Sequence, residues 1–148
     1  MKKTAILACG TVFFLLAAVA SFAGNADAAQ RLGELEGTWL FDADATAKQL
    51  QSSSNNELEQ NKFKHRLELS HGNTCLEIRA LDASTLRITS RNLYDEATDK
   101  NTFAMHVDYN RGRDYYIDEE IGLIAIREGV LAFQSIHSEL SLLYRKME

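Results

Sequence analysis

Ser135 and His137 are the residues whose types and spacing come closest to a catalytic pair. Nucleophilic catalysis needs a base within hydrogen-bonding reach of the serine and a third group that orients the base. Residues two apart on one strand share a face but lie about 6–7 Å apart, too far for a direct hydrogen bond. The sequence also lacks a Gly-x-Ser-x-Gly turn. We therefore predict no catalytic residue, and an enzyme that uses Ser135 or an acidic cluster is the weakest of three functional hypotheses.

His71 and Cys75 have the spacing of half a metal site, with three residues between them. The strand register predicted below places the histidine on the apolar face and the cysteine on the solvent face, so that the two side chains diverge. The sequence offers no second pair of ligands, and we predict neither a bound metal nor a cofactor. Because Cys75 is expected to be exposed, a disulfide that joins two chains into a dimer is a hypothesis for it.

Two acidic runs and one basic turn are the remaining candidates for chemistry. Asp118-Glu119-Glu120, and the group Asp95, Glu96 and Asp99, lack the alternating ligands of a calcium loop. Arg111-Gly112-Arg113 carries two charges that could hold an anion. Charged runs of this kind are typical of solvated turns, and we predict solvated turns here.

The first 28 residues are predicted to direct export. Two lysines precede the uncharged stretch 5–23, and small residues then offer cleavage after Ala23 or Ala28. A retained membrane anchor is the alternative, since about 18 apolar residues can span a bilayer. Alanine, glycine and threonine dilute this stretch, however, and no basic stop-transfer residues follow it. We expect a cleaved signal peptide over 1–28, a periplasmic or secreted location, and no membrane span in the mature chain.

Charge and cysteine content narrow the partners of the mature chain. Loss of residues 1–28 removes two lysines and one aspartate, which changes the formal net charge from −5 to −6. An acidic domain without a basic stripe argues against binding to nucleic acid or to anionic lipid.

Removal of Cys9 leaves one cysteine, so that no disulfide within the chain can form. Residues 32–148 fit a single domain that is stabilised by packing.

The segments that position these residues begin with a strand and two helices. Residues 38–41 form a predicted short strand, after which Asp42 or Asp44 can cap a helix through its carboxylate. Apolar residues then recur at helical spacing. The polar run at 52–56 predicts a break before a second short helix. We therefore predict helix–break–helix over residues 44–62.

From Phe63 onward the apolar period changes to two, which predicts strands. Gly72-Asn73 suits a two-residue hairpin turn that sets Leu69 opposite Leu76, and a slip by one residue would place a leucine against a glutamate. The same alternation continues in the segments 85–91, 103–109, 115–117 and 140–144.

Glu128-Gly129 suits another two-residue turn, which places Ile126 opposite Leu131. The whole pattern predicts about nine strands joined by short turns, each apolar on one face only. Such a meander buries its apolar face by curling over it, and closure into a barrel also removes exposed edges. The predicted fold class is mostly β: an antiparallel meander that closes into a small barrel, with a short helix–turn–helix after the first strand.

Gly37-Thr38-Trp39 at the start of the first strand resembles the Gly-x-Trp motif of the calycins, the superfamily of lipocalins and fatty-acid-binding proteins. Two helices directly after that strand, and the closing segment 140–146, are similar to the fatty-acid-binding branch in particular. The resemblance implies a small lipocalin-like barrel. It also implies that Trp39 packs near the base of the barrel, beneath Arg145 from the last strand.

The leading hypothesis is a non-enzymatic envelope protein that binds an apolar or amphipathic small molecule. The residues that we expect to line any cavity are Trp39, Phe103, Met105 and Tyr144, although a filled core explains such residues equally well. The fatty-acid-binding branch holds a carboxylate with an Arg-x-Tyr pair, and here Leu142 stands in the arginine position. The alternative is a protein–protein module, an inhibitor or accessory factor of another envelope protein, that acts through the loops 94–101 and 110–116.

Overall fold

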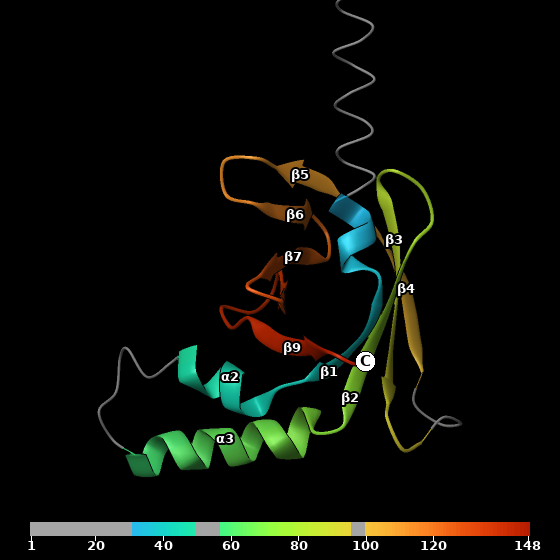
Figure 1. Cartoon of the computed structure of the whole chain (residues 1–148). Coiled ribbons are helices and arrows are strands. Elements are labelled where there is room, and N and C mark those ends of the chain that lie inside the picture. The colour runs from blue at the N-terminus through green and yellow to red at the C-terminus, as the bar shows by residue number, and fades with distance from the viewer. Residues whose placement is uncertain (1–30, 50–56, 96–99) are drawn as a thin grey trace, which may run out of the picture.

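A computed structural model describes residues 31–49, 57–95 and 100–148 of the chain (Figure 1). The predicted signal peptide, the polar run at 52–56, and Glu96 and Asp99 lie outside these described residues. Within them, nine strands form one antiparallel sheet in the order β4-β3-β2-β1-β9-β8-β7-β6-β5. The strands are β1 (Gly37–Phe41), β2 (Thr74–Ala80), β3 (Thr85–Asn92), β4 (Asn101–His106), β5 (Asp108–Asn110), β6 (Tyr115–Asp118), β7 (Gly122–Arg127), β8 (Val130–Ser135) and β9 (Leu142–Lys146).

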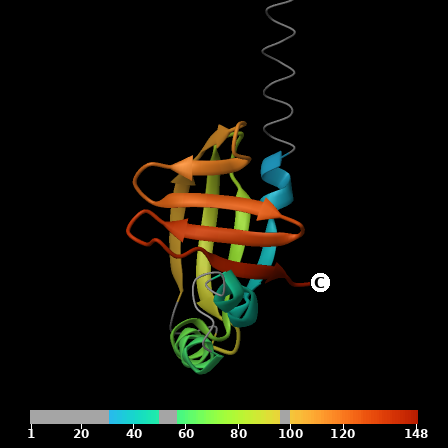
Figure 2. The same ribbon diagram turned by 90° about the vertical axis from the view of Figure 1, so that its left-hand side faces the viewer.

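The sheet curls into a nearly closed barrel, which confirms the predicted fold class. β1 pairs with both β2 and β9, so that the first and last strands of the described chain lie side by side. Strands β6–β9 cross over the face formed by β2–β4 (Figure 2). The two ends of the sheet, β4 and β5, are neighbours along the chain and leave a seam where the barrel is not continuously hydrogen-bonded.

Asp118 closes part of this seam. The backbone N–H of His106 in β4 donates to Oδ2 of Asp118 in β6 at 2.8 Å, and the N–H groups of Glu120 and Ile121 donate to Oδ1 at 2.9 and 3.2 Å. Burial opposes ionisation of the Asp118 carboxyl, but the three backbone donors outweigh burial and hold its pKa below the usual value. The predicted solvated acidic run is therefore wrong for Asp118, which is buried, whereas Glu119 and Glu120 are exposed.

Two helices follow β1, as predicted, but the second is much longer than expected. α2 (Ala43–Lys48) is capped by Asp42, whose carboxylate accepts the N–H of Ala45 at 2.9 Å. α3 (Glu57–His71) runs beneath α2, and Nζ of Lys64 lies 2.7 Å from Oδ1 of Asp44, which joins the two helices.

The predicted strand at 63–70 and its hairpin are wrong. Residues 57–71 contain no β-branched residue and are rich in glutamate, leucine and lysine, so helix propensity outweighs the short alternation of apolar residues. Leu69, the expected partner of Leu76, is 74% exposed on α3. Gly72 ends the helix instead: its N–H donates to the carbonyl of Glu68 at 2.9 Å, and a Cβ there would lie 2.2 Å from the same oxygen.

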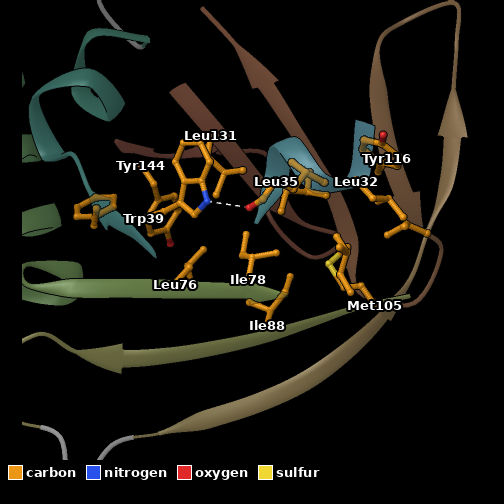
Figure 3. Packing of buried hydrophobic residues seen from close by; sticks show 14 of the residues in the cluster. Leu32, Leu35, Trp39, Leu76, Ile78, Ile88, Met105, Tyr116, Leu131 and Tyr144 are labelled. Atoms are coloured by element: carbon orange, nitrogen blue, oxygen red, sulfur yellow. Dashed lines mark hydrogen bonds between the residues drawn. The ribbon is translucent and has the colours of Figure 1, made fainter. Parts of the chain in front are cut away.

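The core lies inside the barrel around Trp39 (Figure 3). The indole N–H of Trp39 donates to the carbonyl of Leu35 at 2.9 Å, which satisfies the one polar group of the buried ring. Residues 31–35 are helical, and their Leu32 and Leu35 are each 1% exposed in the same cluster as Met105. This short helical segment therefore fills one end of the barrel with apolar side chains.

Candidate functional site

The four residues predicted to line a cavity lie in or beside the core. Trp39, Met105 and Tyr144 are at most 3% exposed. Burial raises the pKa of Tyr144 to about 12. Phe103 is half-buried, with its ring centroid 6.4 Å from that of Phe133. Three of the four are thus closely packed, and the role of all four in ligand binding stays a prediction.

The basic residue over Trp39 is Lys146 and not the expected Arg145. Nζ of Lys146 lies 5.3 Å from the centroid of the indole, within range of a cation–π interaction. Trp39 pairs with Lys146 in the register of β1 and β9, whereas Arg145 pairs with Leu40 and points to the opposite face of the sheet. Gly37 allows this approach, because a Cβ at that position would lie 3.0 Å from Cε of Lys146.

Cys75 is fully buried, so the expected exposed thiol is wrong. It does lie on the outer face of β2, as the alternation predicts, but Leu40 and Arg91 flank it in the register of the neighbouring strands. Burial raises the pKa of the Cys75 thiol. A disulfide that joins two chains therefore has no accessible sulfur here.

In the described part of the chain, no three histidine, cysteine, aspartate or glutamate side chains gather as a metal site would require.

The remaining sequence candidates occupy turns. The backbone N–H of His137 donates to Oγ of Ser135 at 3.4 Å in the turn after β8, and the histidine side chain is exposed. Residues 111–114 form the turn between β5 and β6, where Asp114 adopts a positive φ of 56°. Arg113 from this turn reaches the largest described hollow of the molecule.

This hollow, hereafter the outer groove, has a volume of about 690 Å³ and lies on the outer face of β6–β9. Its floor is explained by the register of β7 and β8. Ile124 and Leu131 point into the core and are fully buried, so Ala125 and Ala132 point outward, and they are direct partners. Two methyl groups side by side leave a depression in a surface where neighbouring side chains are larger. The residues that line the groove are Gln49, Arg113, Tyr115, Leu123, Ala125, Arg127, Glu128, Val130, Ala132, Gln134, Ser141 and Leu143.

The outer groove is apolar in the middle and polar at both ends. At the end near the β7–β8 turn, a terminal nitrogen of Arg127 donates to the backbone carbonyl of Arg113 at 3.3 Å, and both arginines line this end of the groove together with Glu128. At the other end, the side-chain amide of Gln49 donates to the carbonyl of Ser141 at 2.8 Å, and the hydroxyl of Ser141 lies 3.0 Å from the side-chain oxygen of Gln134. The groove therefore has one charged end, with two arginines and one glutamate, and one neutral polar end.

The sequence contained a signal for this groove. The predicted Glu128-Gly129 turn is confirmed, with φ values of 53° and 77°, and so is the pairing of Ile126 with Leu131. That register alone places Ala125 opposite Ala132 on the outer face. Sequence reasoning missed the groove because it looked for a ligand site inside the barrel.

Comparison with protein-family models, with curated proteins and with solved structures yields no match for this chain. Among the helices of the described residues, none combines the length and the apolar composition needed to cross a membrane.

Proposed function

We propose that the protein is a non-enzymatic binding protein that holds a small amphipathic molecule in the outer groove. The main observation is the hollow of about 690 Å³ above the paired Ala125 and Ala132. Ligand pockets typically measure about 300–1,000 Å³ and combine an apolar lining with a few polar groups. The barrel interior near Trp39 is a poorer candidate, because Leu32 and Leu35 pack against it.

The two ends of the groove indicate which way such a molecule lies. Its apolar part rests on the alanine pair between Leu123 and Leu143. An anionic end meets Arg113 and Arg127, whose two positive charges outnumber the single carboxylate of Glu128 at that end. Arginine is well suited to carboxylate or sulfonate groups, since its planar N–H donors match two oxygens at once. An anionic amphipath is therefore the preferred ligand class.

A protein partner is the second candidate occupant of the outer groove, and the position of the groove supports it. Arg113 and Tyr115 on the groove rim belong to the predicted interaction loop 110–116. Tyr94, the first residue of the other predicted loop, 94–101, is 79% exposed. An apolar side chain of a partner would enter the groove in place of a small molecule.

Family and location remain part of the proposal. Membership in the calycins is supported by Trp39 under Lys146, by the pairing of β1 with β9, and by the helices that follow β1. A periplasmic or secreted location is supported by the sequence of residues 1–28.

Native mass spectrometry tests the proposed function directly. The protein is purified from its own envelope without detergent, as wild type, as Ala132→Phe, and as the control Ala104→Phe. Ala104 is an exposed alanine on the outer face of β4, away from the groove. A removable extra mass of small-molecule size in the wild type and the control, absent in Ala132→Phe, supports the proposal. A bare mass in all three contradicts it, and a co-purified protein lost only in Ala132→Phe supports the second candidate.

A further inference from the structure

A second hollow, of about 270 Å³, lies on the outer face of β2–β4 and is separate from the outer groove. Two arginines in its lining, Arg79 and Arg87, are direct partners in the register of β2 and β3. The Cβ atoms of directly opposite residues on antiparallel strands lie about 4.5–5.5 Å apart, and like charges in such a pair destabilise the sheet. An anion between the two guanidinium groups would remove this repulsion.

No acidic side chain in the described part of the chain forms an ion pair with either of these arginines. In residues 31–49, 57–95 and 100–148, neither Arg79 nor Arg87 has an ion-pair or hydrogen-bond partner for its guanidinium group. Glu77, a carboxylate in the lining of the hollow, is already paired: its Oε1 lies 2.6 Å from Nε of Arg91. Arg79 and Arg87 therefore have no direct ion-pair partner among the described residues, and the Glu77 carboxylate beside them is shared with Arg91.

Two threonines add neutral donors beside the arginines. Thr89 and Thr102 are partners in the register of β3 and β4, and their hydroxyl oxygens lie 3.0 Å apart. One hydrogen bond between them uses one of the two hydroxyl protons, which leaves the other proton to donate to a ligand. The lining of the hollow thus combines two guanidinium groups and one hydroxyl donor with one carboxylate, Glu77, that is already paired with Arg91.

We propose that this hollow binds a phosphate group, either as inorganic phosphate or as the phosphomonoester of a small soluble molecule. Guanidinium groups recognise phosphate through paired N–H···O bonds, and hydroxyl donors satisfy a remaining oxygen. The volume of about 270 Å³ admits a phosphate with a small substituent. We assign the phosphate to a soluble molecule and not to a bilayer, because the net negative charge of the chain opposes approach to an anionic surface.

Nuclear magnetic resonance titration of the full chain with inorganic phosphate at low ionic strength tests this site. The variants are Arg79→Gln and Arg87→Gln, and the control is Arg66→Gln, which removes an equal charge from the exposed surface of α3. We expect shifts at the backbone amides of 79, 87 and 89, and a dissociation constant weakened about tenfold or more by either site variant but not by the control. Equal weakening in all three variants, or no saturable shift up to tens of millimolar phosphate, would overturn the proposal.

Two further measurements complete the test. Thermal unfolding distinguishes phosphate binding from a purely structural effect of the two arginines, and sedimentation with vesicles distinguishes a soluble phosphate from a phospholipid. Thermal unfolding in phosphate-free buffer is expected to occur at a higher temperature in Arg87→Gln than in the wild type, since the variant removes the repulsion. Added phosphate is expected to raise the melting temperature of the wild type and not of this variant. If the wild type sediments together with phosphatidic acid vesicles and Arg87→Gln does not, the assignment to a soluble ligand is overturned.

Discussion

Ala125 and Ala132 face each other across β7 and β8 on the outside of a barrel whose inside is packed around Trp39. On the inward face of the same two strands, the adjacent positions hold Ile124 and Leu131, which are fully buried. The hairpin therefore packs Ile124 and Leu131 into the core and places the two alanines on the outer face, where Ala125 is only 4% exposed at the floor of the groove. The alanine pair is the physical origin of the outer groove and the reason to look for a ligand outside the barrel.

Asp118→Asn is expected to weaken the barrel seam. The amide nitrogen of asparagine would meet the N–H of His106, so this part-buried donor would lose its acceptor, at a cost of about 1–3 kcal/mol at neutral pH. The pKa of Asp118 is lowered in the folded state, so its ionised form adds stability above the unfolded-state pKa of about 3.9. That contribution is lost as pH falls below this value toward the folded-state pKa.

Denaturant unfolding of the wild type, Asp118→Asn and the exposed control Asp108→Asn, at neutral pH and between pH 5 and about pH 3, checks this expectation. The wild type and the control should lose stability over the acidic range more steeply than Asp118→Asn does. Equal stability of all three proteins at neutral pH would show that Asp118 does not hold the seam.

Gly72→Ala is expected to destabilise the end of α3. A Cβ at this position would lie 2.2 Å from the carbonyl oxygen of Glu68, a backbone atom that moves only if the helix end moves. We expect a loss of roughly 1–3 kcal/mol in the free energy of unfolding. Gly112→Ala is the control, because its Cβ would meet only an ordinary contact at 3.6 Å. If both variants unfold at the same denaturant concentration, the helix does not end as described.

Cys75 is expected to react slowly with thiol reagents in the folded protein. The side chain is fully buried, and burial raises the pKa of the thiol, which reduces the thiolate fraction that attacks the reagent. Labelling with a dinitrobenzoate disulfide, in a chain with Cys9→Ser, should be slow under native conditions and become rapid only in denaturant. Rapid labelling under native conditions would show that the thiol is accessible, and the hypothesis of a disulfide-linked dimer would then stand.

Turn chemistry and alternation together predicted the hairpin of β7 and β8 correctly, but the same combination failed at Gly72-Asn73. The Glu128-Gly129 turn has residues that tolerate positive φ, and the flanking apolar residues match in only one register, so the hairpin could be derived in full. The Gly72-Asn73 pair gave the same local signal, and Asn73 does adopt a positive φ of 61°, but the pair ends a helix. A glycine–asparagine step serves both purposes, and only the helix propensity of residues 57–71 separates them.

The predicted partner of Trp39 was one residue away from the observed one. Arg145 and Lys146 are both basic, and which of them covers the indole depends on how β9 pairs with β1. That pairing joins segments about a hundred residues apart and has no turn to set its register. The buried state of Cys75 escaped prediction for a related reason, since alternation gives the face of a residue but not what its neighbours cover.

The most direct test of the central claim is a map of where an anionic amphipath binds. Amide and methyl chemical shifts are followed while 1-anilinonaphthalene-8-sulfonate is added to the wild type, Ala132→Phe and the control Ala104→Phe. We predict that the shifts cluster at Leu123, Val130 and Leu143, with binding weakened about tenfold or more in Ala132→Phe and unchanged in the control. Shifts that cluster instead at Phe103 and Tyr144 would contradict the account and place the ligand inside the barrel.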